Sequence, residues 1–173
     1  MLAKTAFKRG DALYHSVHGL CCVKEIVKQN GIGKEEGYYS LVPKLTNRMG
    51  IRFLVSVNDV ETSGFHLPIS LKEANEILDY LKTSNVKASP DSLVQDNGAW
   101  AFAKAVLVFS CDKLQDRNQR KRELLDRAAK GLVRELAFVL EISAKQAASK
   151  VQRSLEYASS VNPSVLAILK HIN

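Results

Sequence analysis

The sequence predicts an α+β fold with a β module at residues 1–83 and a compact all-α domain of four to five helices at residues 89–173. Residues 11–60 alternate short apolar runs with turn signals, a pattern typical of antiparallel strands. Beyond residue 89, apolar residues instead recur at helical spacing between N-cap signals. A short polar stretch separates the two patterns, and we expect the domain boundary at residues 84–88.

The strand pattern of the β module is clearest in its last run, residues 49–57. Earlier runs predict strands within residues 12–17, 20–28 and 38–45, and the Gly-Ile-Gly tripeptide at 31–33 predicts a hairpin turn. In the last run two sets of side chains alternate, and we expect the first to face the core and the second to face outward. The first set is Ile51, Phe53, Val55 and Val57, and the second is Arg52, Leu54 and Ser56.

Capping signals place the helices. Ser70 and Glu73 form a capping box before apolar residues at helical spacing, which predicts a helix over residues 70–83. The Ser89-Pro90 pair predicts a further helix start. Four later helices are expected at residues 99–114, 120–140, 147–155 and 163–171, the third after a capping box at Ser143 and Gln146 and the last after Asn162-Pro163.

The residues give no support for catalysis. The four histidines are scattered, no nucleophile motif accompanies them, and neither metal-ligand spacing nor a glycine-rich nucleotide fingerprint is present. We therefore expect no enzyme activity, no metal and no cofactor. Cys21, Cys22 and Cys111 read as free thiols in a reducing compartment. Without a long apolar run or a signal peptide, we expect a cytoplasmic protein that does not enter a membrane.

Positive charge is concentrated in the second half of the chain. The net charge is +7, and residues 84–173 contribute 14 basic and 9 acidic residues. The basic residues of one predicted helix and the segment before it are Arg117, Arg120, Lys121, Arg122, Arg127, Lys130 and Arg134. Helical spacing places four of these residues on one side of the helix, opposite a leucine stripe. The four are Arg120, Arg127, Lys130 and Arg134. This side is either a solvated face with intrahelical ion pairs, such as Glu123 with Arg127, or a surface that contacts a polyanion.

Residues 7–19, with the sequence Phe-Lys-Arg-Gly-Asp-Ala-Leu-Tyr-His-Ser-Val-His-Gly, resemble the first strand of the CarD family of bacterial transcription regulators. The matching positions are Phe7, Lys8, Gly10, Asp11, His18 and Gly19. Residues 121–128, 132–137 and 142–143 resemble the later helices of the family's C-terminal domain. The resemblance implies a Tudor-like barrel closed by the helix at 70–83, which docks on the RNA polymerase β subunit, and a helical domain that contacts promoter DNA.

The resemblance also implies functional residues. Polymerase-binding positions would be Gln29, Leu41, Arg52, Leu54 and Ser56. DNA-binding positions would be Trp100 and Lys104 together with the seven basic residues from Arg117 to Arg134. In the family a tryptophan wedges into the minor groove beside melted DNA, and Trp100 is the single candidate for that role. Its apolar neighbours also allow a core position.

The sequence thus predicts a regulator that docks on polymerase and stabilises the promoter open complex through sequence-independent DNA contacts. The alternative is a divergent adaptor that binds polymerase or another protein without touching DNA. This alternative is suggested by departures from the family pattern at Ser16, Ser56 and residues 101–103. Target promoters, the direction of regulation and the oligomeric state do not follow from the residues.

Overall fold

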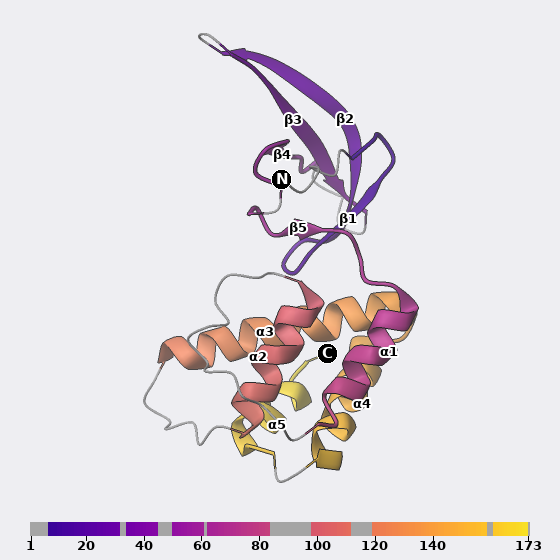
Figure 1. Cartoon of the computed structure of the whole chain (residues 1–173), viewed down its shortest axis with the longest axis vertical. Helices are drawn as coiled ribbons and strands as arrows, with labels where there is room; N and C mark the ends of the chain where they lie inside the picture. Colours follow the sequence, from indigo (N-terminus) through magenta and orange to yellow (C-terminus); the bar gives the residue numbers. More distant parts are fainter. Residues whose placement is uncertain are drawn as a thin grey trace. The chain divides into compact units, whose positions relative to one another are not determined.

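In its described residues the chain has an α+β fold made of a curled antiparallel sheet and five helices (Figure 1). The computed structural model describes residues 7–31, 34–44, 50–60, 62–83, 98–111, 119–158 and 161–172, and the side chains of 29–31, 34–36 and 158 are outside that description. The chain divides into two compact units, Met1–Pro68 and Ile69–Asn173. We call them the sheet unit and the helical unit.

The sheet unit contains five strands in the order β4-β3-β2-β1-β5. Their bounds are Ala12–His15 for β1, Gly19–Gly31 for β2, Lys34–Pro43 for β3, Phe53–Ser56 for β4 and Phe65–His66 for β5. β2 and β3 form the expected hairpin, but both strands are longer than expected at the turn: β2 continues past residue 28 to Gly31, and β3 begins before residue 38, at Lys34. They therefore extend beyond β1 and β4 as a two-stranded ribbon (Figure 1).

One face of the curled sheet encloses the core of this unit. Tyr39, Leu41 and Val55 lie on that face, as alternation along β3 and β4 requires. They pack with further buried residues, which are Leu13, Cys21, Val23, Val60 and Phe65. The Tyr39 hydroxyl accepts a hydrogen bond of 3.0 Å from the Phe7 amide and so holds the first described residue against the core.

The helical unit contains α1 (Leu71–Tyr80), α2 (Ala99–Cys111), α3 (Gln119–Val139), α4 (Ala144–Ala158) and α5 (Pro163–Lys170). The predicted capping boxes are confirmed, because the amides of Glu73 and Gln146 donate to the hydroxyls of Ser70 and Ser143 at 3.2 Å each. Asn162 caps α5 through its side-chain oxygen. The helix start expected at Ser89-Pro90 lies outside the described residues.

Helix α1 belongs to the helical unit and not, as we expected, to the β module. Its buried residues Ala74 and Ile77 join the helical core, together with Leu81 just beyond the helix. A further link comes from α3, where the fully buried Glu135 accepts a hydrogen bond from the Ile69 amide at 3.3 Å. The division therefore falls at Pro68 and Ile69, and not at residues 84–88.

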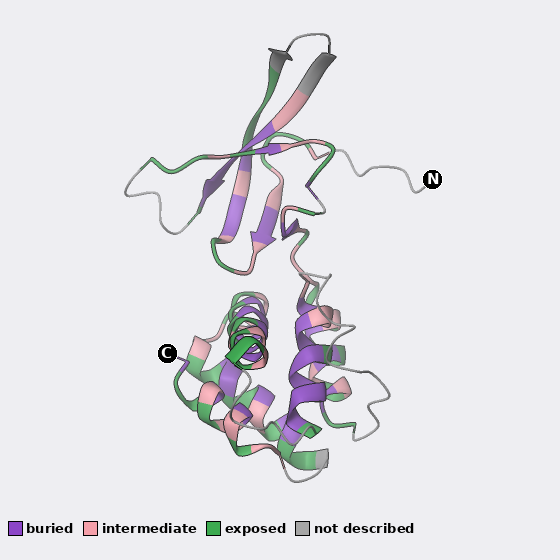
Figure 2. Cartoon of the chain, turned by 90° about the vertical axis from the view of Figure 1, so that its left-hand side faces the viewer, coloured by how far each residue is buried: buried purple, intermediate pink, exposed green. Residues whose placement is uncertain are grey.

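The centre of the helical unit is the contact between α2 and α3. Most of α2 is buried, and its ribbon in Figure 2 is largely purple. The ring of Phe102 lies so close to Gly131 that a Cβ added to Gly131 would come within 2.6 Å of it. The glycine therefore permits a close approach of the two helices at this point.

Candidate functional site

Strand β4 forms one edge of the sheet, and three of the predicted polymerase-binding positions lie on it or directly before it. It pairs with β3 on one side, so the main-chain groups on its other side are not used by a described strand. Leu54 points outward from this edge and is 62% exposed. Arg52, just before the strand, forms an ion pair of 3.1 Å with Glu25, and Ser56 is partly exposed. We call Arg52 to Ser56 the sheet edge.

Two other predicted polymerase-binding positions do not belong to this surface as described. Leu41 is fully buried in the sheet core, so it has no surface with which to contact a partner. The expectation for Leu41 was therefore wrong, because it lies opposite Phe53 on the inward face of β3. The main chain of Gln29 lies in β2, but its side chain is outside the described residues.

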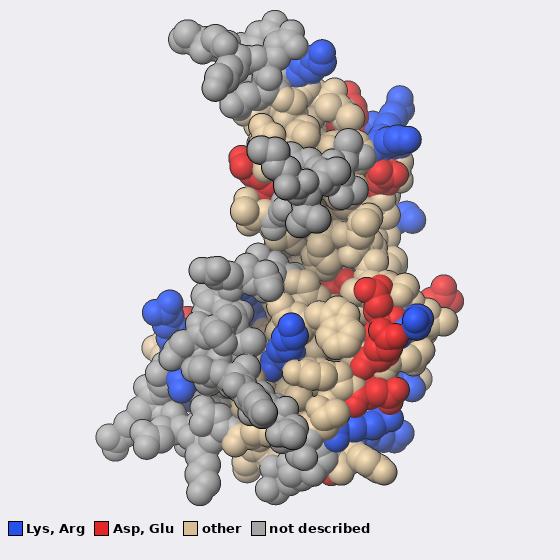
Figure 3. Space-filling model, viewed as in Figure 1, with Lys and Arg blue, Asp and Glu red and all other residues tan. Residues whose placement is uncertain are grey.

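Helix α3 presents a row of positive charge. Arg120, Arg127, Lys130 and Arg134 are all exposed, and the buried residues of the helix, among them Leu125 and Leu132, face the core. The sequence prediction that these four cations share a side opposite the leucine stripe is confirmed. Figure 3 shows basic side chains gathered at the end of the helical unit where α3 begins. We call these four residues the α3 basic row.

The α3 basic row is partly neutralised by its own helix. Lys130 forms an ion pair of 2.8 Å with Asp126, one turn earlier. Arg127 and Arg134 also take part in interactions with neighbouring groups. Glu123 accepts a hydrogen bond of 2.9 Å from Gln119. Exposed ion pairs of this kind contribute little stability and exchange readily, so the arginines stay available to an anionic partner.

The remaining predicted DNA-binding residues are dispersed. Arg122 is exposed and Lys121 is half-buried on α3, whereas Lys104 is exposed on α2. Arg117 lies outside the described residues. The structure thus brings together four of the predicted cations as one row, and the others lie elsewhere on α3, on α2 or outside the described residues.

Trp100 is a half-buried residue at the start of α2 and packs against the helical core. Its ring meets Tyr80 of α1 edge to face, with centroids 5.8 Å apart. Burial at this contact raises the pKa of the Tyr80 hydroxyl. These contacts favour the core alternative for Trp100, because a wedge would have to give up the Tyr80 contact to enter DNA.

In the sheet unit, His15 and His18 make contacts within a turn, and Cys21 is buried. The ring nitrogen Nδ1 of His15 accepts hydrogen bonds from the amides of Val17 and His18, at 3.1 and 3.3 Å, and the rings of His15 and His18 stack at 4.6 Å. These contacts hold the β1–β2 turn, a role that sequence reasoning missed. Burial, and then the adjacent Cys22, raise the pKa of the Cys21 thiol to about 11, which makes it a poor nucleophile.

Sequence reasoning also missed a groove between α1 and α4, since periodicity within a helix does not reveal which helices lie together.

In the described part of the chain, no group of three or more metal-binding side chains is found. None of the described helices has both the length and the apolar surface to cross a bilayer. Comparisons with protein-family models and with curated proteins find no match to this chain.

Proposed function

We propose that the chain is a CarD-like bacterial transcription regulator whose two units act as separate domains. The sheet unit would be a Tudor-like module that docks on the RNA polymerase β subunit. The helical unit would contact promoter DNA without reading its sequence and so stabilise the open complex. The proposal places the protein in the cytoplasm and assigns it no catalytic step and no cofactor.

The single observation that carries the DNA part is the α3 basic row. Cations along one side of a helix can meet successive phosphates of a duplex, and such contacts position a protein without specifying bases. The helix has 21 residues, so the row is long enough to span several phosphates. Trp100 is not needed for this step, since phosphate contacts alone give sequence-independent binding.

The sheet edge supports the docking part. An unpaired strand edge can accept an extended segment from a partner through main-chain hydrogen bonds, and outward side chains then add specificity. Leu54 supplies an exposed apolar contact, and Arg52 supplies a charge held in place by Glu25. With Leu41 removed, the proposed contact set on this strand is Arg52, Leu54 and Ser56.

Two weak contacts on one chain make a tight complex when both partners are present. Docking on polymerase raises the effective concentration of the helical unit near promoter DNA. Weak phosphate contacts then suffice for stable binding, which explains why a partly neutralised basic row would be adequate.

The second candidate is the adaptor that binds proteins with both units. It is favoured by exposed aromatic side chains of the helical unit, Phe138 at the end of α3 and Tyr157 near the end of α4. Exposed aromatic residues are typical of protein interfaces, whereas phosphate binding has no need of them. The two candidates differ in whether DNA binding depends on the α3 basic row.

A salt series on duplex DNA separates the candidates. In the test variant Arg120, Arg127 and Arg134 are replaced by Gln, and in the control variant Lys72, Lys145 and Lys170, also exposed, are replaced by Gln. Both variants lose three positive charges from the helical unit. We expect the test variant to lower the salt dependence of log K by about 2 to 3, at about 0.9 per lost phosphate contact. An equal effect of the control variant, or no DNA binding by the parent chain, would contradict the proposal.

A capture experiment tests the sheet edge. Leu54→Asp places a charge on the proposed contact surface, and Leu67→Asp makes the same change at a residue that is 56% exposed outside the sheet edge. We expect Leu54→Asp to abolish capture of the chain by RNA polymerase and Leu67→Asp to leave it intact. Equal capture of both variants would reject the sheet edge as the docking surface.

A further inference from the structure

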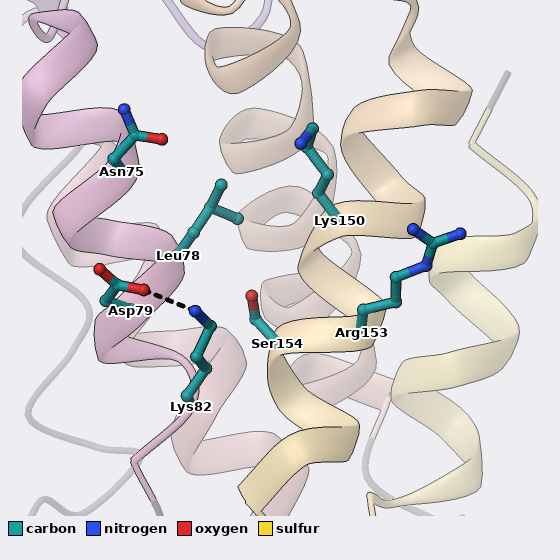
Figure 4. Close-up of a pocket in the computed structure, with 7 residues that line it drawn as sticks. All are labelled: Asn75, Leu78, Asp79, Lys82, Lys150, Arg153 and Ser154. Atoms are coloured by element: carbon teal, nitrogen blue, oxygen red, sulfur yellow. Dashed lines mark hydrogen bonds and ion pairs between the residues drawn. The ribbon is translucent and has the colours of Figure 1, made fainter.

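The helical unit contains a groove between α1 and α4 that neither proposed contact surface uses. Its volume is about 320 Å³. Residues of both helices line it, namely Asn75, Leu78, Asp79 and Lys82 from α1 and the turn after it, and Lys150, Arg153 and Ser154 from α4 (Figure 4). We call this the α1–α4 groove. Its size is at the lower end of the range for small-molecule sites.

The lining of the groove carries an excess of positive charge. Lys82 forms an ion pair of 2.6 Å with Asp79, the one carboxylate among the lining residues. Lys150 and Arg153 form no ion pair with another described residue. They lie three positions apart on α4, a spacing at which like charges repel. The groove therefore holds two positive charges that no described carboxylate offsets.

Ser154 provides a second and independent observation. Ser154 is only 6% exposed as a residue, and it lines the groove. Figure 4 shows the hydroxyl directed into the space between the helices, with Lys82 and Lys150 beside that space and Arg153 directed away from α1. The Ser154 Oγ is not among the fully buried oxygens that lack a partner, so it reaches the surface of the groove, where it can donate a hydrogen bond to an oxygen of a bound ligand.

We propose that the α1–α4 groove binds the phosphate group of a small phosphomonoester. The ammonium groups of Lys82 and Lys150 and the Ser154 hydroxyl would donate to the phosphate oxygens, and Leu78 would contact the organic part of the ligand. Arg153 would add charge at the rim. A phosphomonoester carries about two negative charges at neutral pH, which matches the excess charge of the lining.

The surroundings of the groove argue against a nucleic-acid strand as its occupant. Acidic side chains gather over α1 beside the groove (Figure 3). The acidic residues of α1 are Glu73, Glu76 and Asp79. An extended polyanion would have to pass all three carboxylates, whereas a compact dianion between the two helices meets Asp79 alone, which Lys82 already pairs. This proposal is therefore independent of the DNA contacts assigned to α3.

A titration of the full chain followed by backbone amide NMR tests the proposal. The probes are phenyl phosphate, a monoester, and methyl phenyl phosphate, the matching diester. We expect phenyl phosphate to bind at least tenfold more tightly and to shift the amide signals around residues 150–154 and 82. The proposal is overturned by the absence of saturable shifts at millimolar phenyl phosphate, or by equal affinity for the two probes.

Matched variants locate the site. Lys150→Gln should weaken phenyl phosphate binding about tenfold, whereas Lys145→Gln, an exposed residue on the same helix outside the groove, should change it less than twofold. Ser154→Ala should weaken binding about fivefold while the thermal unfolding midpoint stays within a few degrees. Equal losses from Lys150→Gln and Lys145→Gln would mean that only the general charge of the unit attracts the probe, and the groove would then be rejected.

Discussion

The two units differ in the size of their apolar cores and in how their main-chain hydrogen-bonding groups are paired. Among the described residues, the helical core contains 23 buried apolar residues and the sheet core eight. Helices satisfy their own main-chain groups, so what the helical unit offers a partner is side-chain charge. The sheet instead has main-chain groups at β4 that no described strand uses, and an exposed Leu54 beside them. One chain can thus carry a surface that binds through main-chain groups and a surface that binds through charge, each set by its own fold.

The largest expected effect comes from truncating the two cores separately. Leu132 and Leu41 are both fully buried, the first in the helical core and the second in the sheet core. Each change to Ala should cost about 2–5 kcal/mol in the unit that contains it. If the units fold independently, each variant will lower one unfolding transition in a calorimetric scan and leave the other in place. A single transition that falls equally in both variants would show that the two cores unfold together.

The buried carboxylate of Glu135 gives the next effect. A carboxylate oxygen of Glu135 accepts a hydrogen bond from the amide of Ile69, the residue that leads into α1. The substitution Glu135→Ala therefore leaves that amide without its acceptor. We expect a loss of about 1–3 kcal/mol from the helical unit in denaturant unfolding. Glu135→Gln keeps an oxygen acceptor and is the control, with a smaller loss. If the Glu135→Ala variant were as stable as the parent, the hydrogen bond between Glu135 and the Ile69 amide would contribute nothing to the free energy of unfolding.

Gly131→Ala tests the close contact of α2 and α3. The added methyl would meet the buried ring of Phe102, which has to shift. Overpacking of this kind costs about 1–3 kcal/mol, and the better helix propensity of Ala returns about 0.5–1 kcal/mol. We expect a net loss of about 1–2 kcal/mol by urea unfolding. Gly98→Ala, where an added Cβ meets nothing within 4 Å, is the control and should not show the packing loss.

The smallest effect is at the capping box of α1. The Ser70 amide and hydroxyl both donate to the Glu73 carboxylate at 2.8 Å and lower its pKa. Ser70→Ala should cost about 1 kcal/mol at neutral pH and move the Glu73 pKa upward in an NMR titration. Folding lowers the pKa of Glu73, so its ionised carboxylate stabilises the folded state. This contribution is fully present above the unfolded pKa of Glu73, about 4.3, and disappears as the pH falls through the folded pKa of Glu73. A Glu73 pKa that does not change in Ser70→Ala would contradict this account.

Local signals in the sequence predicted local structure well. The capping boxes at Ser70 and Ser143 and the cap at Asn162 are each decided by residues within one turn, and all are present. The alternation of Phe53 and Val55 against Leu54 also holds, because it depends only on strand geometry. Ile51 was wrongly expected to face the core, because it lies before β4 begins and is exposed.

Features that depend on tertiary partners were not predictable. The apolar face of α1 was recognised, but periodicity cannot say whether Ile77 packs on a sheet or on helices. The burial of Leu41 follows from the register of β3, which the sequence does not specify. The α1–α4 groove joins residues about 70 positions apart, such as Lys82 and Lys150, and no local pattern links them.

Binding of the full chain to a forked promoter duplex, with and without RNA polymerase and over a salt series, tests whether the two units act together. We predict weak binding with a steep salt dependence when DNA is the sole partner, and binding at least a hundredfold tighter when polymerase is present. If polymerase captures the chain and the duplex adds nothing at low salt, the α3 basic row is a solvated face and the chain is an adaptor.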